Sequence, residues 1–382
     1  MIKYLILIPL VIFPYTIFAQ EYNYKEIVEW AKQTFEENDA GASYIIEKKG
    51  RQAYAIHNKL IQEKVDTITT PVSCQNVIRE WLSFFRSAHI EFHYMPEARR
   101  LMAEKKNQIN NAKEQISNTI EGNSLHNKYL YSKIPFIELI NEHTLYLRIP
   151  SFSGKEKSKI DSLIALNRSR ILSTESLIID IRNGTGGGDA SYSEILPLLY
   201  ANPIRVPGVE YFSTKLNNQR MHELATNTGI AIRFGLNSTA EEMKKFQADY
   251  DTLSNHLGEF VNLNSERVQI TKYDTIYPYP KNVGILINGN NVSTDEQFLL
   301  EARQSKKVKL FGTTTKGGLD FSNLYLTYYS PNKDFVLVYA LTRSLRVPGM
   351  VVDNIGIQPD FYIDNEIPES EWIDYVNEIL NE

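Results

Sequence analysis

From about residue 135 onward, short apolar runs alternate with helix-like segments, and this alternation most constrains the fold. Three of the runs are apolar on both faces, as expected for strands covered on both sides: SLIIDIR at 176–182, NVGILING at 282–289 and VKLFG at 308–312. Helical patterns lie at 159–172, 190–201 and 294–305. Strands that alternate with helices predict an α/β domain with parallel strand pairs.

Other segments predict the domain organisation. An amphipathic helix over 23–38 and a second one that begins at Pro71, after a Thr70 cap, indicate an N-terminal helical domain over 20–95. Further expected elements are strands at 144–150, 324–330 and 334–344 and a closing helix at 369–380. A charged helical linker at 96–134 and a polar insertion at 202–280 complete the division, with the α/β domain over 135–382.

The first residues, MIKYLILIPLVIFPYTIFAQ, predict a secretory signal peptide over 1–19, with an uncleaved anchor as the alternative. After cleavage we expect no stable membrane insertion. Cys74 is the single cysteine, so an exported chain of this size depends on a packed core and has no internal disulfide. A net charge of −5 leaves no basic footprint for nucleic acid.

Three loops follow predicted strands, at the edge where open α/β sheets place their sites. The glycine cluster in DIRNGTGGGD (180–189) suits an oxyanion hole or a plain connector, and it lacks the spacing of nucleotide-binding loops. Ser293 stands three residues before Glu296, which is the spacing of a helix cap, but a serine there is also placed to act as a nucleophile. The third loop contains Lys316, either a base or, more simply, an exposed turn residue.

A nucleophilic serine needs a base, and His89 in RSAHIEFHY is the best placed histidine. In an extended segment Ser87, His89, Glu91 and His93 share one face. This face suits a general base with Ser87 as its neighbour. A metal site of His89, Glu91 and His93 is the alternative, although it lacks the H-E-x-x-H order.

Together these segments resemble the serine peptidase family of tail-specific (C-terminal processing) proteases, tricorn core peptidases and retinoid-binding-protein-like modules. The resemblance runs from about Val77 to Ile363 and rests on four blocks in order: LIIDIRNGTGG, INGNNVSTDEQF, KLFGTTTKGG and VVDNIGIQPDFYI. The family pattern D-x-R-x-N-x-G-G falls on Asp180 to Gly187, with Gly184 in place of its asparagine. The usual D-G-H-T around the histidine reads Ser-Ala-His-Ile.

The resemblance implies a crotonase-like (ClpP/crotonase) β-α spiral core, without a PDZ module or cofactor, that hydrolyses peptide or unfolded protein substrates. Position 318, where the Ser-Lys members carry lysine, is glycine, so the resemblance points to the tricorn-like branch. It implies the following site: Ser293 as nucleophile, His89 as base, Asp353 and Ser87 orienting the ring, and N–H groups of Thr294 and of Gly186 or Gly187 as oxyanion donors.

The expected function is therefore an exported serine endopeptidase or carboxyl-terminal-processing-type peptidase. The alternative is a catalytically weakened module on the same fold that binds a peptide or a small apolar ligand. Sequons at Asn183 and Asn291 lie inside the expected site, where glycans would obstruct it, so a bacterial periplasm or exterior is the expected location.

Overall fold

The computed structural model describes residues 23–96, 129–130, 132–228, 238–264, 266–323, 328–364 and 366–382. The predicted signal peptide and most of the predicted linker lie outside these residues. Among the described helices, none has the length and apolar character needed to cross a bilayer.

A six-stranded sheet forms the centre of the α/β part, in the order β15-β10-β9-β4-β3-β2. Only β2 runs antiparallel to its neighbour, so the predicted α/β class and parallel pairs are confirmed. The strands are β2 (Phe136–Asn141), β3 (Thr144–Arg148), β4 (Ser176–Asp180), β9 (Asn282–Ile287), β10 (Val308–Gly312) and β15 (Phe361–Tyr362). Every residue of β4 is buried, as a strand covered on both faces requires.

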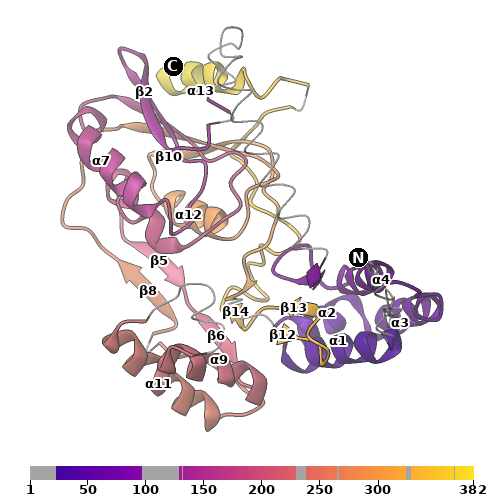
Figure 1. Ribbon diagram of the computed structural model, residues 1–382. Coiled ribbons are helices and arrows are strands. Elements are labelled where there is room, and N and C mark those ends of the chain that lie inside the picture. The colour runs from indigo at the N-terminus through magenta and orange to yellow at the C-terminus, as the bar shows by residue number, and fades with distance from the viewer. Residues whose placement is uncertain are drawn as a thin grey trace, which may run out of the picture.

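Helices cover both faces of this sheet (Figure 1). Alternate strand residues, such as Ile179 and Ile285, pack in one core with α7 (Lys157–Ile171) and α12 (Thr294–Ala302). Their neighbours, such as Ile178 and Leu286, pack on the opposite face against α13 (Trp372–Asn381). Because β4, β9 and β10 run parallel, the loops that follow them all leave the sheet at the carboxyl ends of the strands, side by side.

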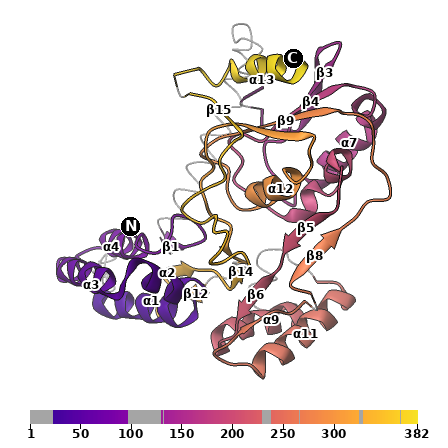
Figure 2. The same ribbon diagram turned by 180° about the vertical axis from the view of Figure 1, so that it is seen from behind.

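A separate helical unit lies to one side of the sheet in both views (Figures 1 and 2). It consists of α1 (Tyr24–Asn38), α2 (Ala42–Lys49), α3 (Arg51–Val65) and α4 (Pro71–Leu82), and it leads into β1 (Glu91–Tyr94). β1 pairs with β13 (Phe335–Val338), which also pairs with β12 (Tyr328–Tyr329). Phe35, Trp81 and Phe85 of the helical unit share a core with Tyr339, so this unit packs on a late segment of the chain.

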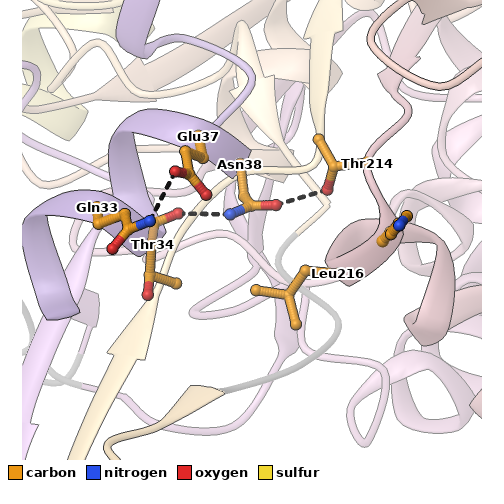
Figure 3. Close-up of a pocket in the computed structure, with 7 residues that line it drawn as sticks. Gln33, Thr34, Glu37, Asn38, Thr214 and Leu216 are labelled. Atoms are coloured by element: carbon orange, nitrogen blue, oxygen red, sulfur yellow. Dashed lines mark hydrogen bonds between the residues drawn. The ribbon is translucent and has the colours of Figure 1, made fainter.

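The insertion forms an arm and a helical pair. Its elements are β5 (Ile204–Pro207), β6 (Val209–Phe212), α9 (Lys215–Thr226), α11 (Ala240–Ser254), β7 (Phe260–Val261) and β8 (Val268–Thr271). From later in the chain, β14 (Thr342–Ser344) pairs with β6 and also with β11 (Phe321–Ser322). The helical pair is bonded to the N-terminal unit at Asn38 (Figure 3), whose Oδ1 accepts from Thr214 Oγ1 at 2.6 Å. Asn217 Nδ2 donates to the Asn38 carbonyl at 2.8 Å.

Two predicted elements differ from the structure. The helix expected at 190–201 is a short 3₁₀ turn (Asp189–Tyr192) followed by α8 (Leu196–Leu199), where Pro197 has no N–H to donate to a longer helix. The strand expected at 334–344 is divided between β13 and β14. The chain leaves the first sheet where Ala340 N–H donates to Asp39 Oδ2 at 3.0 Å and the Ala340 carbonyl accepts from Ala40.

Candidate active site

Ser293 stands at the turn between β9 and α12, directly before the helix. Its backbone holds φ 62° and ψ −121°, a conformation that costs an L-residue about 1–3 kcal/mol. Strained strand-to-helix turns of this kind present the nucleophilic serine in other hydrolase folds. The sequence left open whether Ser293 is only a helix cap, and this backbone indicates a residue held for another purpose.

The carboxylate of Glu296 fixes this turn by hydrogen bonds. One carboxylate oxygen accepts from the N–H groups of Ser293 (3.2 Å) and Gly318 (2.9 Å). The other accepts from the N–H of Gly317 (2.8 Å) and from Thr315 Oγ1 (2.6 Å). The S-x-x-E spacing therefore serves as a helix start and also ties the loop after β10 to the serine.

His89 lies against Ser293, with Nε2 3.1 Å from the serine Oγ. Its Nδ1 lies 2.6 Å from the carbonyl oxygen of Phe321, which only accepts hydrogen bonds, so Nδ1 carries the proton and Nε2 is the free acceptor. Burial lowers the pKa of His89 to about 4, while the Phe321 carbonyl acts in the opposite direction. The imidazole is therefore neutral at pH 7 and in the tautomer that takes a proton from Ser293.

The structure corrects the expected orienting groups. The Phe321 carbonyl occupies the place on the ring that the resemblance assigned to Asp353. Asp353 instead accepts the N–H groups of Leu319 and Asp320, both at 2.6 Å, through Oδ1, and so shapes the loop beside the site. Ser87 is exposed, and its N–H donates to Asn354 Oδ1 at 3.2 Å.

The glycine loop after β4 lies directly on the serine. A Cβ at Gly186 would stand 2.8 Å from Ser293 Cβ, and φ there is +81°. A Cβ at Gly187 would stand 2.1 Å from the Phe152 carbonyl oxygen, so neither position has room for a side chain. Gly187 and Thr294 line the same cleft as Ser293, whereas the Gly186 N–H faces the carboxylate of Asp295.

The cleft around Ser293 has a volume of about 550 Å³. Pro207 and Val209 of the insertion form part of its wall. Arg346 also lines it, although its Nε is paired with buried Asp320 at 3.0 Å. The insertion thus contributes to the cleft, and the cleft carries polar as well as apolar groups.

The alternative readings of the sequence find less support. Lys316 is exposed. At Gly318, the position of the family's lysine, a Cβ would stand 2.3 Å from Ala88 Cβ, so the histidine segment occupies that space. His93 pairs with Glu91 at 2.8 Å, while both ring nitrogens of His89 are engaged elsewhere. The described residues contain no group of three or more His, Cys, Asp or Glu arranged to hold a metal.

Sequence reasoning missed two groups of the site. The Phe321 carbonyl is a backbone atom, and no residue type signals it. The sequence did not single out Asp295, yet the glycine at 184, where the family pattern has asparagine, is a signal that another side chain fills that space.

A neutral imidazole nitrogen facing a serine hydroxyl is the arrangement by which serine hydrolases activate their nucleophile. The class that this fold and site define is therefore a serine-type hydrolase. A model described as Peptidase family S41 matches residues 143–363, more than half of the chain. The chain belongs to this family and is a serine-type peptidase.

Solved structures share the fold. A candidate peptidase from Parabacteroides merdae is 14% identical, with a TM-score of 0.54, over 94% of this chain and 97% of that one. Mature CPAF is 13% identical, with a TM-score of 0.56, over 94% of this chain and 96% of that one. A comparison with curated proteins found no match.

Proposed function

We propose that the protein is an exported serine endopeptidase, or a carboxyl-terminal-processing-type peptidase, with Ser293 as nucleophile and His89 as general base. The observation that carries the proposal is the 3.1 Å contact between Ser293 Oγ and His89 Nε2. Two segments 204 residues apart in the chain meet there in the geometry required for proton transfer.

In the proposed mechanism, Ser293 Oγ attacks the carbonyl carbon of the scissile bond as its proton passes to His89 Nε2. The Phe321 carbonyl holds Nδ1–H throughout and so keeps the imidazolium oriented. The N–H groups of Gly187 and Thr294 stabilise the oxyanion, and the helix dipole of α12 adds to them. His89 then protonates the leaving amine, and water releases the acyl group by the same steps in reverse order.

The proposed substrate is a peptide or an unfolded protein segment, since the wall that Pro207 and Val209 supply restricts a cleft of about 550 Å³. A crotonase-like arrangement of the core, the absence of a PDZ module, cofactor-free chemistry and export by the N-terminal signal belong to the same proposal. The domain boundaries predicted from sequence also remain part of it.

A serine-reactive fluorophosphonate probe tests the proposal. The protein should be labelled, Ser293→Ala should abolish labelling, and His89→Asn should slow it by roughly 10³-fold or more. Ser191→Ala, a buried serine outside the cleft lining, is the matched control and should label normally. Dye-labelled casein provides the peptidase readout.

The alternative is a weakened module that binds a peptide or small apolar ligand. The altered residue at 184 and the displaced Asp353 are the observations on its side. A folded protein that neither reacts with the probe nor cleaves casein would favour this alternative and end the peptidase proposal.

A further inference from the structure

A buried acid lies beneath the glycine loop and has no role in the mechanism above. Asp295, the second residue of α12, is 1% exposed. Its Oδ2 accepts from Asn291 Nδ2 at 2.9 Å, and the same amide group donates to the Ile181 carbonyl at 2.6 Å. Asn291 Oδ1 in turn accepts from Asn288 N–H at 2.8 Å. The acid is thus linked to the chain where β4 ends.

Because Gly184 has no side chain, it leaves room for this carboxylate. A Cβ there would lie 2.4 Å from Asp295 Oδ2. Its φ lies outside the left-handed range, so the backbone at 184 does not itself demand glycine. The replacement of the family's asparagine by glycine therefore has a spatial cause, because the side chain of Asp295 occupies the volume that a residue at 184 would need.

The Gly186 N–H also faces this carboxylate. Gly186 is buried against Ser293, whereas the next residue, Gly187, is exposed to the cleft. A carboxylate that holds the Gly186 N–H away from the cleft fixes the plane of the peptide unit 185–186, and the positive φ of Gly186 sets the next unit relative to it. The direction of the Gly187 N–H depends on that plane.

We propose that Asp295 is a positioning residue of the oxyanion hole, whose buried carboxylate holds the Gly184–Gly187 loop against the first turn of α12 so that the N–H groups of Gly187 and Thr294 converge. The inference rests on the proposed function and names a residue for it. Asp295 Oδ1 has no hydrogen-bond partner among the described residues, and burial raises the pKa of the group to about 7. A buried acid with an unpaired oxygen destabilises the fold, which is expected of a residue kept for the site.

The experiment measures hydrolysis of p-nitrophenyl acetate and inhibition by the peptide aldehyde acetyl-Leu-Leu-norleucinal, which forms a tetrahedral oxyanion. Asp295→Ala should lower kcat by about 10- to 100-fold with KM within about 3-fold, and should weaken aldehyde binding by a similar factor. Asp295→Asn keeps an acceptor oxygen for Asn291 and Gly186 and should restore kcat to within about 3-fold.

Two further variants separate positioning from general support. Glu301→Ala removes another buried acid of α12, one that is bonded to Tyr192 and Gln297, and should leave kcat and aldehyde affinity within about 3-fold. In the exchange variant Gly184→Asn/Asp295→Ala, an amide enters the vacated space from the loop side. It should recover at least part of the lost kcat.

The outcomes distinguish this inference from the proposed function. A wild-type protein without esterase activity would overturn the proposed function, and the inference with it. Active wild type together with a folded Asp295→Ala variant of normal kcat and aldehyde affinity would overturn the inference alone. Should Asp295→Ala not fold, Gly184→Ala tests the same point by displacing the carboxylate, and an unchanged kcat in that variant would refute the inference.

Discussion

Ser293 and His89 both hold φ angles near +60° (62° and 58°), which L-residues rarely adopt. Each angle costs about 1–3 kcal/mol, and hydrogen bonds from other segments maintain it. The Gly318 carbonyl accepts from the Ser293 N–H at 3.1 Å, and the Phe321 carbonyl holds the histidine ring. At the residue scale, the site stores strain in the two groups that would exchange a proton.

The lowered pKa of His89 sets the expected acid limit of activity. Because burial lowers this pKa to about 4, the imidazole stays unprotonated far below the pH at which an ordinary histidine titrates. The fluorophosphonate labelling rate should hold near its plateau down to about pH 5 and reach half of it near pH 4. Circular dichroism at each pH controls for unfolding. A midpoint near 6.5 would contradict the buried geometry.

Asp353→Asn tests whether the carboxylate acts on the ring or only on the loop at Leu319 and Asp320. Activity should stay within about 10-fold of wild type, since the Phe321 carbonyl orients His89; an acid that orients the ring directly is worth about 10⁴-fold. A loss near 10⁴-fold would show that Asp353 does orient the His89 ring.

The stability of the same variant should depend on pH in a defined direction. Burial, followed by the nearby charge of Asp320, raises the pKa of Asp353 to about 6. The folded wild type therefore binds this proton more tightly than the unfolded chain does, and loses stability as pH rises from about 4 to about 6. Urea unfolding should show the variant gaining roughly 2–3 kcal/mol relative to wild type between pH 4 and pH 8.

At the scale of elements, the buried strands were predictable and their ends were not. β4, β9 and β10 are apolar on both faces because helices cover both, and that pattern is visible in sequence. The expected strand at 334–344 is instead interrupted at Ala340, whose backbone N–H donates to Asp39, some 300 positions away in the chain. No local pattern encodes such a partner.

The site was predictable to a similar degree. Ser293 and His89 stand where motif order placed them and do meet. The orienting group was missed because the carboxylate in the expected motif position, Asp353, bonds to the loop after β10 at Leu319 and Asp320, and because side-chain direction depends on packing. One methylene less than glutamate also shortens its reach.

Gly318→Ala tests the fit between the loop after β10 and the histidine segment. The added Cβ would stand 2.3 Å from Ala88 Cβ and 2.8 Å from Val292 Cγ2, so the segment that contains His89 must shift. We expect a loss of about 1–3 kcal/mol in unfolding free energy and about 10²-fold in labelling rate. The double variant Gly318→Ala/Ala88→Gly removes the clash and should recover most of both. Normal behaviour of the single variant would show that the segment adapts.

At the scale of the molecule, a buried ion pair within the helical unit lies where this unit meets the segment at Ala340. Arg86 Nη1 donates to Asp39 Oδ1 at 2.8 Å, and both side chains are fully buried. Asp39 also accepts the Ala340 N–H, and Arg86 Nη2 reaches the His89 carbonyl at 3.3 Å. The pair thus connects three parts of the chain immediately behind the base.

Asp39→Ala leaves the Arg86 charge buried without its partner and should destabilise the protein by about 3–5 kcal/mol in urea unfolding. Lys25→Ala breaks an exposed pair with Asp66, 2.8 Å apart, and should change stability by less than about 1 kcal/mol. Similar effects of the two variants would indicate that water reaches the Asp39 pair.

The separation of 204 residues between His89 and Ser293 has a consequence for the protein while it is being synthesised and folded. The histidine is synthesised early and the serine late, and neither of the two units contains both. Under the proposed mechanism, a nascent or half-folded chain has a serine hydroxyl without its base, and peptidase activity would first arise when the helical unit docks on β13. Under that mechanism, incomplete folding would by itself keep the peptidase inactive toward other unfolded copies of the chain.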